Sequence, residues 1–155
     1  MRQYCLAKTL FLMLALATVA VGILIQGSSA WAEGTSLPYS DGGRIQPGAI
    51  IKKYNQSGER FRIEGTCRSS CTMLLAIKNS CVDPNATLRF HAALFMNEVA
   101  KGQMTPPADR QAAMLKSYNA KLRNYLVSGG YVQTFAYHDI SGRDIISKFG
   151  YRACT

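Results

Sequence analysis

The sequence predicts an α/β fold in which short strands and helices alternate along the chain, and three observations support this. Segment 60–64 alternates apolar and polar residues and runs into Gly65, as a half-buried strand does. Segment 45–54 before it has apolar residues at helical spacing. A second alternating run, 88–90, follows the apolar segment 72–77. An order of strand, helix, strand, turn, helix and strand is typical of layered α/β domains with right-handed crossovers.

The first 32 residues have the composition of a signal peptide. Two basic residues precede an apolar run over 9–25, and Ala30-Trp31-Ala32 has the pattern of a cleavage site. We therefore expect a signal peptide over 1–32 and one domain over 33–155, which would be periplasmic or secreted. Because the apolar run is close to a membrane-spanning length, the alternative is an uncleaved N-terminal membrane anchor with the domain facing the periplasm.

The chain of 155 residues carries a formal net charge of +9, which falls by two without the leader. Such a charge raises the question of a nucleic-acid or anionic membrane partner. Apart from Lys52-Lys53, however, the basic residues of the domain are scattered singly, and no basic run is interleaved with aromatic residues. This pattern favours a solvated basic surface. We expect no nucleic-acid partner, and contact with a membrane only if the leader is retained.

The cysteines indicate an oxidising compartment. Cys5 lies in the leader, which leaves Cys67, Cys71, Cys81 and Cys154 for two disulfides. Four cysteines allow three pairings, and the sequence does not choose among them. Cys67 and Cys71 also have the spacing of zinc ligands, but no cluster of cysteine and histidine completes such a site. The sequence therefore predicts disulfides and no metal site.

The residues best suited to chemistry lie in the stretch 65–91. Ser69 occupies a turn of small residues just before segment 72–77, which we expect to form a buried helix. Near a helix N-terminus, backbone N–H groups can stabilise an oxyanion. A serine hydroxyl becomes a good nucleophile only when a base takes its proton. The candidate base is His91, which ends the strand predicted over 88–90.

These motifs resemble those of a known family, the Clp protease proteolytic subunits. GTCRSSCTMLLA is similar to the G-x-A-A-S-M-G nucleophile turn, and SDGGRIQPGAIIKKY over 40–54 is similar to the S-P-G-G turn and its helix, with Asp41 in place of the proline. The closer likeness is to small periplasmic Clp-protease-like proteins, in which a C-x-S-x-C turn is followed by a helix and by a strand that ends in histidine. The resemblance implies a crotonase/Clp-protease-like layered βα fold, abbreviated at its N-terminus.

The resemblance also implies a role for each matched residue. Ser69 matches the nucleophile and His91 the base, while the backbone N–H groups of Gly43 and Ser70 match the two donors of the oxyanion hole. Asp139 matches the third member of the catalytic triad, at nearly the family's spacing before a C-terminal Phe-Gly-Tyr.

Two residues compete for roles in this site. Asp144 is the alternative third triad member, but it follows Ser141 by three residues. That spacing is typical of a helix N-terminus, so we prefer a capping role for Asp144 in a helix over 145–149. His138 could replace the base, but it neighbours Asp139. Adjacent residues of a strand point to opposite faces, and we expect His138 to face solvent.

Between these motifs, the sequence predicts one long helix from Asp109 through Val127, ended by Gly129-Gly130. Its apolar stripe consists of Leu115, Tyr118, Leu122, Tyr125 and Leu126. Such a stripe is far more often a packing surface than a ligand site. Segment 131–137 is aromatic and favours a strand.

The leading functional hypothesis is an exported serine hydrolase, most simply a serine peptidase with a Ser-His-Asp triad, which acts on a peptide or protein substrate. The mechanism requires no metal and no cofactor, and the resemblance is compatible with a homo-oligomer. The alternative is a catalytically inactive exported domain of the same fold that binds a peptide or a partner protein.

Overall fold

The computed structural model describes residues 33–43 and 45–155, so the predicted signal peptide and its cleavage site lie outside the described residues. In chain order the elements are β1 (Gly34–Thr35), η1 (Leu37–Tyr39), α2 (Pro47–Ser57), β2 (Phe61–Ile63), β3 (Thr66–Arg68), η2 (Ser69–Ala76), β4 (Ser80–Val82), β5 (Thr87–Phe90), α3 (Met96–Val99), α4 (Ala108–Lys116), α5 (Ala120–Ser128), β6 (His138–Ser141) and α6 (Gly142–Ser147). None of the described helices is long and apolar enough to cross a membrane.

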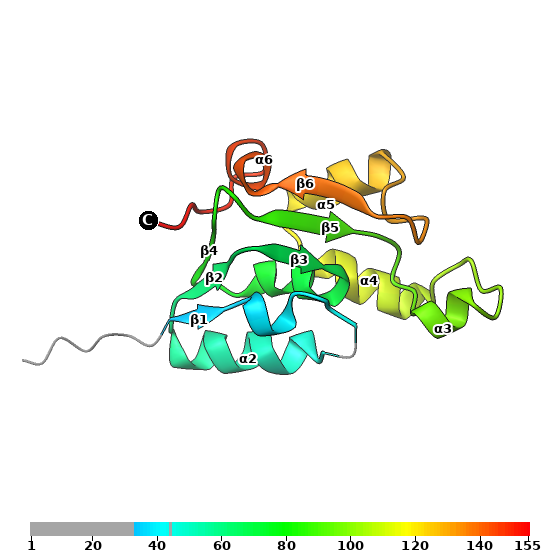
Figure 1. Cartoon of the computed structure of the whole chain (residues 1–155), viewed down its shortest axis with the longest axis horizontal. Coiled ribbons are helices and arrows are strands. Elements are labelled where there is room, and N and C mark those ends of the chain that lie inside the picture. The colour runs from blue at the N-terminus through cyan, green and yellow to red at the C-terminus, as the bar shows by residue number, and fades with distance from the viewer. Residues whose placement is uncertain (1–32, 44) are drawn as a thin grey trace, which may run out of the picture. The chain divides into compact units, whose positions relative to one another are not determined.

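The strands form two small sheets (Figure 1). The first has the order β1-β2-β4 and is entirely parallel. The second has the order β3-β5-β6, in which β3 and β5 are parallel and β6 runs antiparallel to β5. Only Glu64 and Gly65 separate β2 from β3, so the chain passes directly from one sheet to the other. The predicted α/β class is confirmed at this level.

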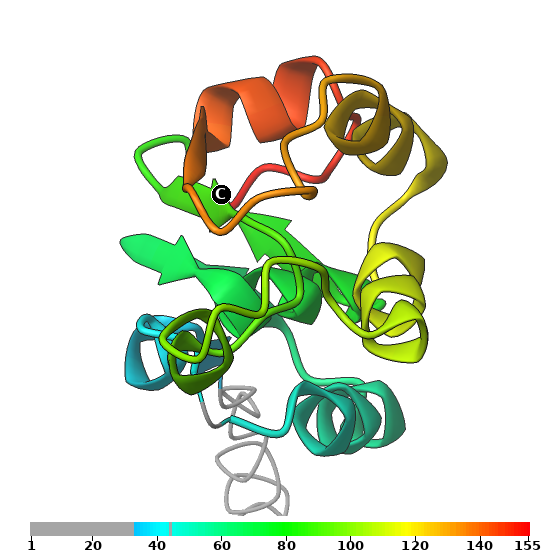
Figure 2. The same cartoon turned by 90° about the vertical axis from the view of Figure 1, so that its right-hand side faces the viewer.

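Helices α2, α4 and α5 lie along the same side of the strands (Figure 2). The strands alternate as expected: Phe61 and Ile63 of β2 are buried, and so are Leu88 and Phe90 of β5. The 3₁₀ helix η2, which sequence analysis placed over 72–77, lies within the core, with four of its eight residues buried. Burial of these apolar faces is the main force that holds the layers together.

Helix α2 forms largely where the sequence predicted a helix. It begins at Pro47, whose missing N–H is harmless in the first turn, and it ends before Gly58, which adopts the left-handed conformation with φ 73°. Tyr54 is the buried residue of its inner face, and its ring packs edge-on against Phe61 at 4.7 Å between centroids.

The single long helix predicted over 109–127 is wrong, because the structure has two helices, α4 and α5, with a break at Ser117–Asn119. Asn119 Oδ1 accepts a hydrogen bond from the Leu122 backbone N–H at 3.0 Å, and so begins a new helix. Its amide group donates to Phe149 O at 2.8 Å. These two hydrogen bonds of Asn119 fix the break between α4 and α5.

The strand predicted over 131–137 is also wrong, since this segment forms turns and β6 begins only at His138. The backbone N–H of Ala92 donates to Thr134 O at 2.7 Å, which ties this segment to the residue after His91. Helix α3 was not predicted. It is one turn long, and Glu98 accepts a hydrogen bond from the Phe95 backbone N–H at 2.7 Å, closing that turn.

Two disulfides are present, and the structure gives the pairing that the sequence left open. Cys67 pairs with Cys71 and Cys81 with Cys154, with Cα separations of 5.3 and 4.9 Å. The first brackets the turn that holds Ser69, and the second attaches the C-terminal segment to β4. Disulfides of this kind indicate an oxidising environment.

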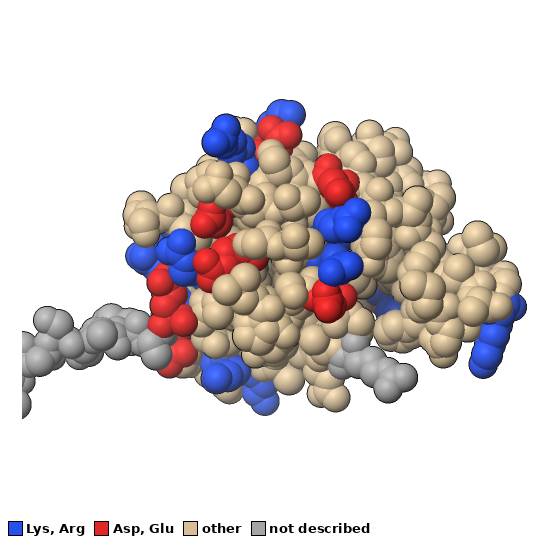
Figure 3. Space-filling view, viewed as in Figure 1, with Lys and Arg blue, Asp and Glu red and all other residues tan. Residues whose placement is uncertain are grey.

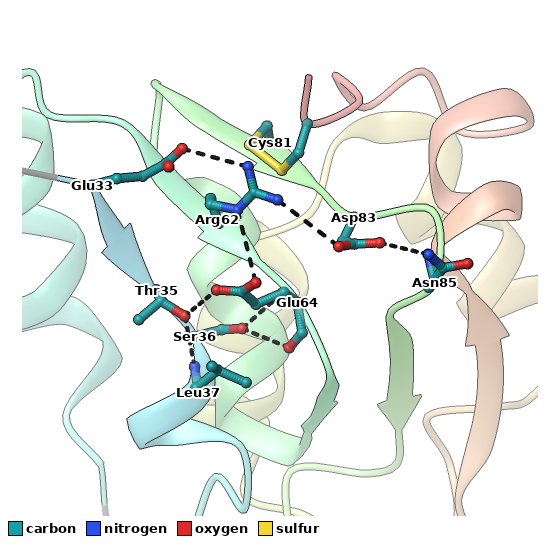
Figure 4. Close-up of polar contacts among 10 residues, drawn as sticks. Glu33, Thr35, Ser36, Leu37, Arg62, Glu64, Cys81, Asp83 and Asn85 are labelled. Atoms are coloured by element: carbon teal, nitrogen blue, oxygen red, sulfur yellow. Dashed lines mark hydrogen bonds and ion pairs between the residues drawn. A yellow bond between two sulfur atoms is a disulfide. The ribbon is translucent and has the colours of Figure 1, made fainter. Parts of the chain in front are cut away.

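The surface carries both signs of charge. On the face shown in Figure 3, acidic and basic side chains lie interspersed rather than in one large basic patch. Beside the second disulfide, Arg62 of β2 lies among three carboxylates (Figure 4). It is 3.8 Å from Glu33, 3.8 Å from Glu64 and 3.9 Å from Asp83. These contacts connect the segments that carry β1, β2 and β4 and have a structural role.

Candidate functional site

The strand arrangement brings Ser69 and His91 to the same edge of the second sheet. Strands β3 and β5 are adjacent and parallel, with Arg68 opposite Arg89, and the two candidate residues follow the carboxyl ends of these strands. In α/β folds this is the edge at which ligands bind. Ser69 and His91 line the same two cavities, of about 160 and 180 Å³. In the described part of the chain, no hydrogen bond joins the two side chains.

Ser69 has an unusual backbone conformation. Its φ of +55° makes it the only non-glycine residue with positive φ in the described part of the chain. Such a conformation is costly for a residue with a side chain and clusters at functional sites. Two interactions hold the Ser69 backbone in this conformation. The Cys67–Cys71 disulfide brackets the turn, and the Thr72 hydroxyl donates to Ser69 O at 2.7 Å.

A buried tyrosine, Tyr118, is hydrogen-bonded to Thr72, which holds the same turn. Tyr118 lies at the break between α4 and α5, and its hydroxyl oxygen is 2.7 Å from Thr72 Oγ1. Because the single hydroxyl proton of Thr72 is used for Ser69 O, Tyr118 is the donor in this pair. Burial raises the pKa of Tyr118 well above its usual value, and the hydrogen bond to Thr72 only partly opposes this. The tyrosine therefore stays a neutral donor.

The glycine turn lies directly against the serine turn. A Cβ on Gly42 would lie 2.3 Å from Arg68 O and 2.9 Å from Ser69 Cβ, so only glycine allows this approach. The Ser70 hydroxyl donates to Gly43 O at 3.3 Å. The backbone N–H groups of Gly43 and Ser70 donate to no backbone acceptor in the described residues. Both predicted oxyanion-hole residues also line the 160 Å³ cavity.

His91 is buried, with 5% of its surface exposed. Its ring packs edge-on against Phe135 and Tyr137, at centroid distances of 4.9 and 5.1 Å. Burial lowers the pKa of His91, and the backbone of Ala92 opposes the shift. The imidazole is therefore neutral at neutral pH, as a general base must be. Its Nδ1 is buried and has no hydrogen-bond partner in the described part of the chain.

Asp139 lies on the neighbouring strand but is bonded to a different residue. It is directly opposite Arg89 in the ladder between β5 and β6, and its carboxylate accepts a hydrogen bond from Arg89 Nε at 2.8 Å. The structure therefore does not place Asp139 on His91 Nδ1. Its part in a triad stays a prediction.

The competitors occupy other environments. The Asp144 backbone N–H donates to Ser141 Oγ at 3.1 Å, and its carboxylate lies 3.2 Å from Nζ of Lys148, the residue after α6. Asp144 therefore lies in the first turn of a capped helix as predicted, but Ser141 is the cap, and the helix spans Gly142–Ser147 rather than 145–149. His138 does not simply face solvent as predicted: its ring stacks on Tyr131 at 3.5 Å, and its Nε2 is 3.2 Å from the Tyr125 hydroxyl.

Sequence analysis missed two residues that hold the chain after His91. Gln111 of α4 accepts a hydrogen bond from the Ala93 backbone N–H at 3.0 Å and donates to Val132 O at 2.7 Å. Arg110 donates to Ala93 O at 3.2 Å and forms two hydrogen bonds with Glu98, at 2.7 and 2.9 Å. The partners are too far apart in sequence for any periodic pattern, and only the pairing of opposite charges could have suggested the contact with Glu98.

The described residues contain no group of three or more histidine, cysteine, aspartate or glutamate side chains that could hold a metal ion. No family model, curated protein or solved structure matches the chain. The resemblance to Clp-protease-like proteins therefore stays a prediction from the motifs, and the chemical argument depends on the geometry.

Proposed function

We propose that the protein is an exported serine hydrolase, most simply a peptidase, in which Ser69 attacks the scissile carbonyl. One observation carries the proposal. The only described non-glycine residue with positive φ is a serine, and it lines the same cavities as a buried histidine with a lowered pKa. A serine and a neutral imidazole that face the same cavity are the two groups that nucleophilic catalysis needs, and backbone strain of this kind clusters at functional sites.

In the proposed reaction, His91 accepts the proton of Ser69 as the oxygen attacks, and later returns it to the leaving group. The N–H groups of Gly43 and Ser70 stabilise the oxyanion. Two observations support this role. Neither N–H group donates to a backbone acceptor in the described residues, and η2 begins at Ser69, so N–H groups at the start of this helix are available to an oxyanion. Asp139 acts as the third triad member when its carboxylate reaches His91 Nδ1. The layered sheets and the position of the site at strand ends support a crotonase/Clp-protease-like arrangement.

The oxidised cysteines support a periplasmic or secreted location, which is the compartment that the predicted signal peptide implies. The substrate would be a peptide or protein segment that lies across the two cavities. Their shared lining of Gly43, Ser69, His91, Leu94 and Phe95 would place a scissile bond next to the proposed nucleophile.

The direct test is hydrolysis of casein and of short fluorogenic peptides by the oxidised protein. Turnover is expected for the wild type and is expected to disappear in Ser69→Ala. Ser128→Ala is the matched control, because this exposed serine ends α5 and its hydroxyl only donates to Tyr125 O. Melting curves show that each variant is folded. Equal turnover by wild type and Ser69→Ala would refute the proposal.

Two observations favour a second candidate, a catalytically inactive domain that binds a peptide or partner protein. The carboxylate of Asp139 is held by Arg89, and Phe95 and Met96, which line the 180 Å³ cavity, are 46% and 70% exposed. If the protein is an inactive binding domain, the wild type should show no turnover, and Ser69→Ala should bind the peptide as well as the wild type does. Fluorescence anisotropy with a labelled peptide, run beside the turnover assay, separates the two candidates.

A further inference from the structure

Contacts between side chains connect four residues at the end of the β5–β6 ladder. Arg89 is opposite Asp139, and Phe90 and His138 form the last pair of the ladder. Tyr137, which precedes β6, contacts two of the four: Arg89 Cζ lies 4.6 Å from its ring centroid, and the His91 ring centroid lies 5.1 Å from it. The contacts therefore run from Asp139 through Arg89 and Tyr137 to His91.

Arg89 comes between Asp139 and His91 in this series of contacts. Its guanidinium donates to the Asp139 carboxylate and lies over the Tyr137 ring, against which the His91 ring packs. His91 follows Arg89, the ladder partner of Asp139, by two residues, and positions with that diagonal relation are about 7–8 Å apart where a ladder continues.

His91 Nδ1 is buried and forms no well-aligned hydrogen bond in the described part of the chain, although the Ala92 backbone is near enough to the ring to oppose the effect of burial on its pKa. Most buried polar atoms in folded proteins are hydrogen-bonded, and an exception calls for an explanation. Asp41, which lines the 180 Å³ cavity, is paired with Arg68. Arg110 and Tyr118 line the 160 Å³ cavity, where Arg110 donates to Ala93 O and the Tyr118 hydroxyl is bonded to Thr72 Oγ1. Asp139 is the carboxylate that these contacts connect to the His91 ring.

We propose that Arg89 is a positioning residue that holds Asp139 away from His91, so that the site rests with its triad incomplete. Release of Asp139 from Arg89 lets the carboxylate turn to His91 Nδ1. The side chains of Arg89 and Asp139 are 33% and 48% exposed, and ion pairs this exposed contribute little to stability. The loss of this ion pair therefore costs little free energy. This inference rests on the proposed function for its catalytic meaning, but the geometry can be tested without catalysis.

The test follows the titration of His91 by NMR in the full domain, with His138→Gln used to assign the two histidine signals. Arg89→Met keeps a long side chain but removes the charge, and Arg89→Lys is the conservative variant that retains an ion pair. In Arg89→Met, Asp139 is free to bond to Nδ1, and a carboxylate partner raises the pKa of an imidazole. We expect the His91 pKa to rise by about one pH unit or more in Arg89→Met, and to stay near the wild-type value in Arg89→Lys.

Removal of a nearby cation would itself raise the His91 pKa, so the same change is made in Asp139→Asn. The rise in the His91 pKa caused by Arg89→Met should be much smaller in that background, because the neutral amide cannot stabilise a protonated imidazole as a carboxylate does. An equal rise in both backgrounds would overturn the inference. So would an unchanged His91 pKa in a folded Arg89→Met.

Kinetics then separate the two proposals. If Ser69 is the nucleophile, Arg89→Met should increase the rate of fluorophosphonate labelling at least several-fold, and the acid limb of its pH profile should move to higher pH. Labelling that is unaffected by Arg89→Met refutes the positioning role and leaves the hydrolase proposal intact. An Asp139-dependent pKa rise in a protein that no probe labels supports the exchange of partners and refutes the hydrolase.

Discussion

The left-handed conformation of Ser69 gives a prediction about stability. A side chain at positive φ costs about 1–2 kcal/mol that glycine avoids, whereas glycine loses about 0.5–1 kcal/mol through the greater entropy of the unfolded chain. At φ +55° the first effect is the larger. Ser69→Gly should therefore be about 1 kcal/mol more stable than Ser69→Ala, which corresponds to about 4 °C in Tm for a domain of this size.

The assay is thermal and urea unfolding of both variants without reductant, so that both disulfides stay intact. Ala113→Gly is the matched control. Ala113 is an exposed residue inside α4, where φ is negative and glycine should instead cost about 1 kcal/mol relative to alanine. Neither Ser69 variant should hydrolyse peptide. If Ser69→Gly is no more stable than Ser69→Ala, the turn is not strained and the main structural argument for a functional serine fails.

Three further predictions follow from particular contacts. Replacement of Cys81 and Cys154 by alanine should lower the free energy of unfolding by about 4.4 kcal/mol, because the disulfide closes a loop of 73 positions and restricts the unfolded chain. A loss below about 1 kcal/mol in urea unfolding would contradict this estimate. His91 must be neutral to act, and burial lowers its pKa from the ordinary value of 6.5. We therefore expect kcat/KM to fall only as the pH drops below 6.5. A loss of kcat/KM that begins above pH 6.5 would contradict the burial of His91. Gly42→Ala, whose Cβ would lie 2.3 Å from Arg68 O, should cost about 1–3 kcal/mol in urea unfolding and reduce turnover, and unchanged values would refute the close approach of the two turns.

Local patterns in the sequence were enough to place the two main site residues. Alternation in 60–64 and 88–90 predicted β2 and β5, and the small residues around Ser69 predicted the turn between a strand and a helix. Because parallel strands end at one edge of a sheet, these short-range signals also placed Ser69 and His91 at the same edge.

The failures all depend on contacts between residues that are distant in sequence. The break before α5 is set by Asn119, whose amide binds Phe149 O across 30 positions. The partner of Asp139 is chosen by the register that places it opposite Arg89, and spacing along the chain carries no information about that register. Helix α3 depends on the bonds between Glu98 and Arg110, which close a loop that no periodic pattern marks.

The central claim is that Ser69 is a nucleophile activated by His91. The most direct measurement is reaction of the oxidised wild-type protein with a fluorophosphonate probe, followed by intact mass and peptide mapping. A single adduct on Ser69 is expected, with none in Ser69→Ala and much slower formation in His91→Ala. A folded wild-type protein that forms no adduct, or an adduct on any other serine, would contradict the account.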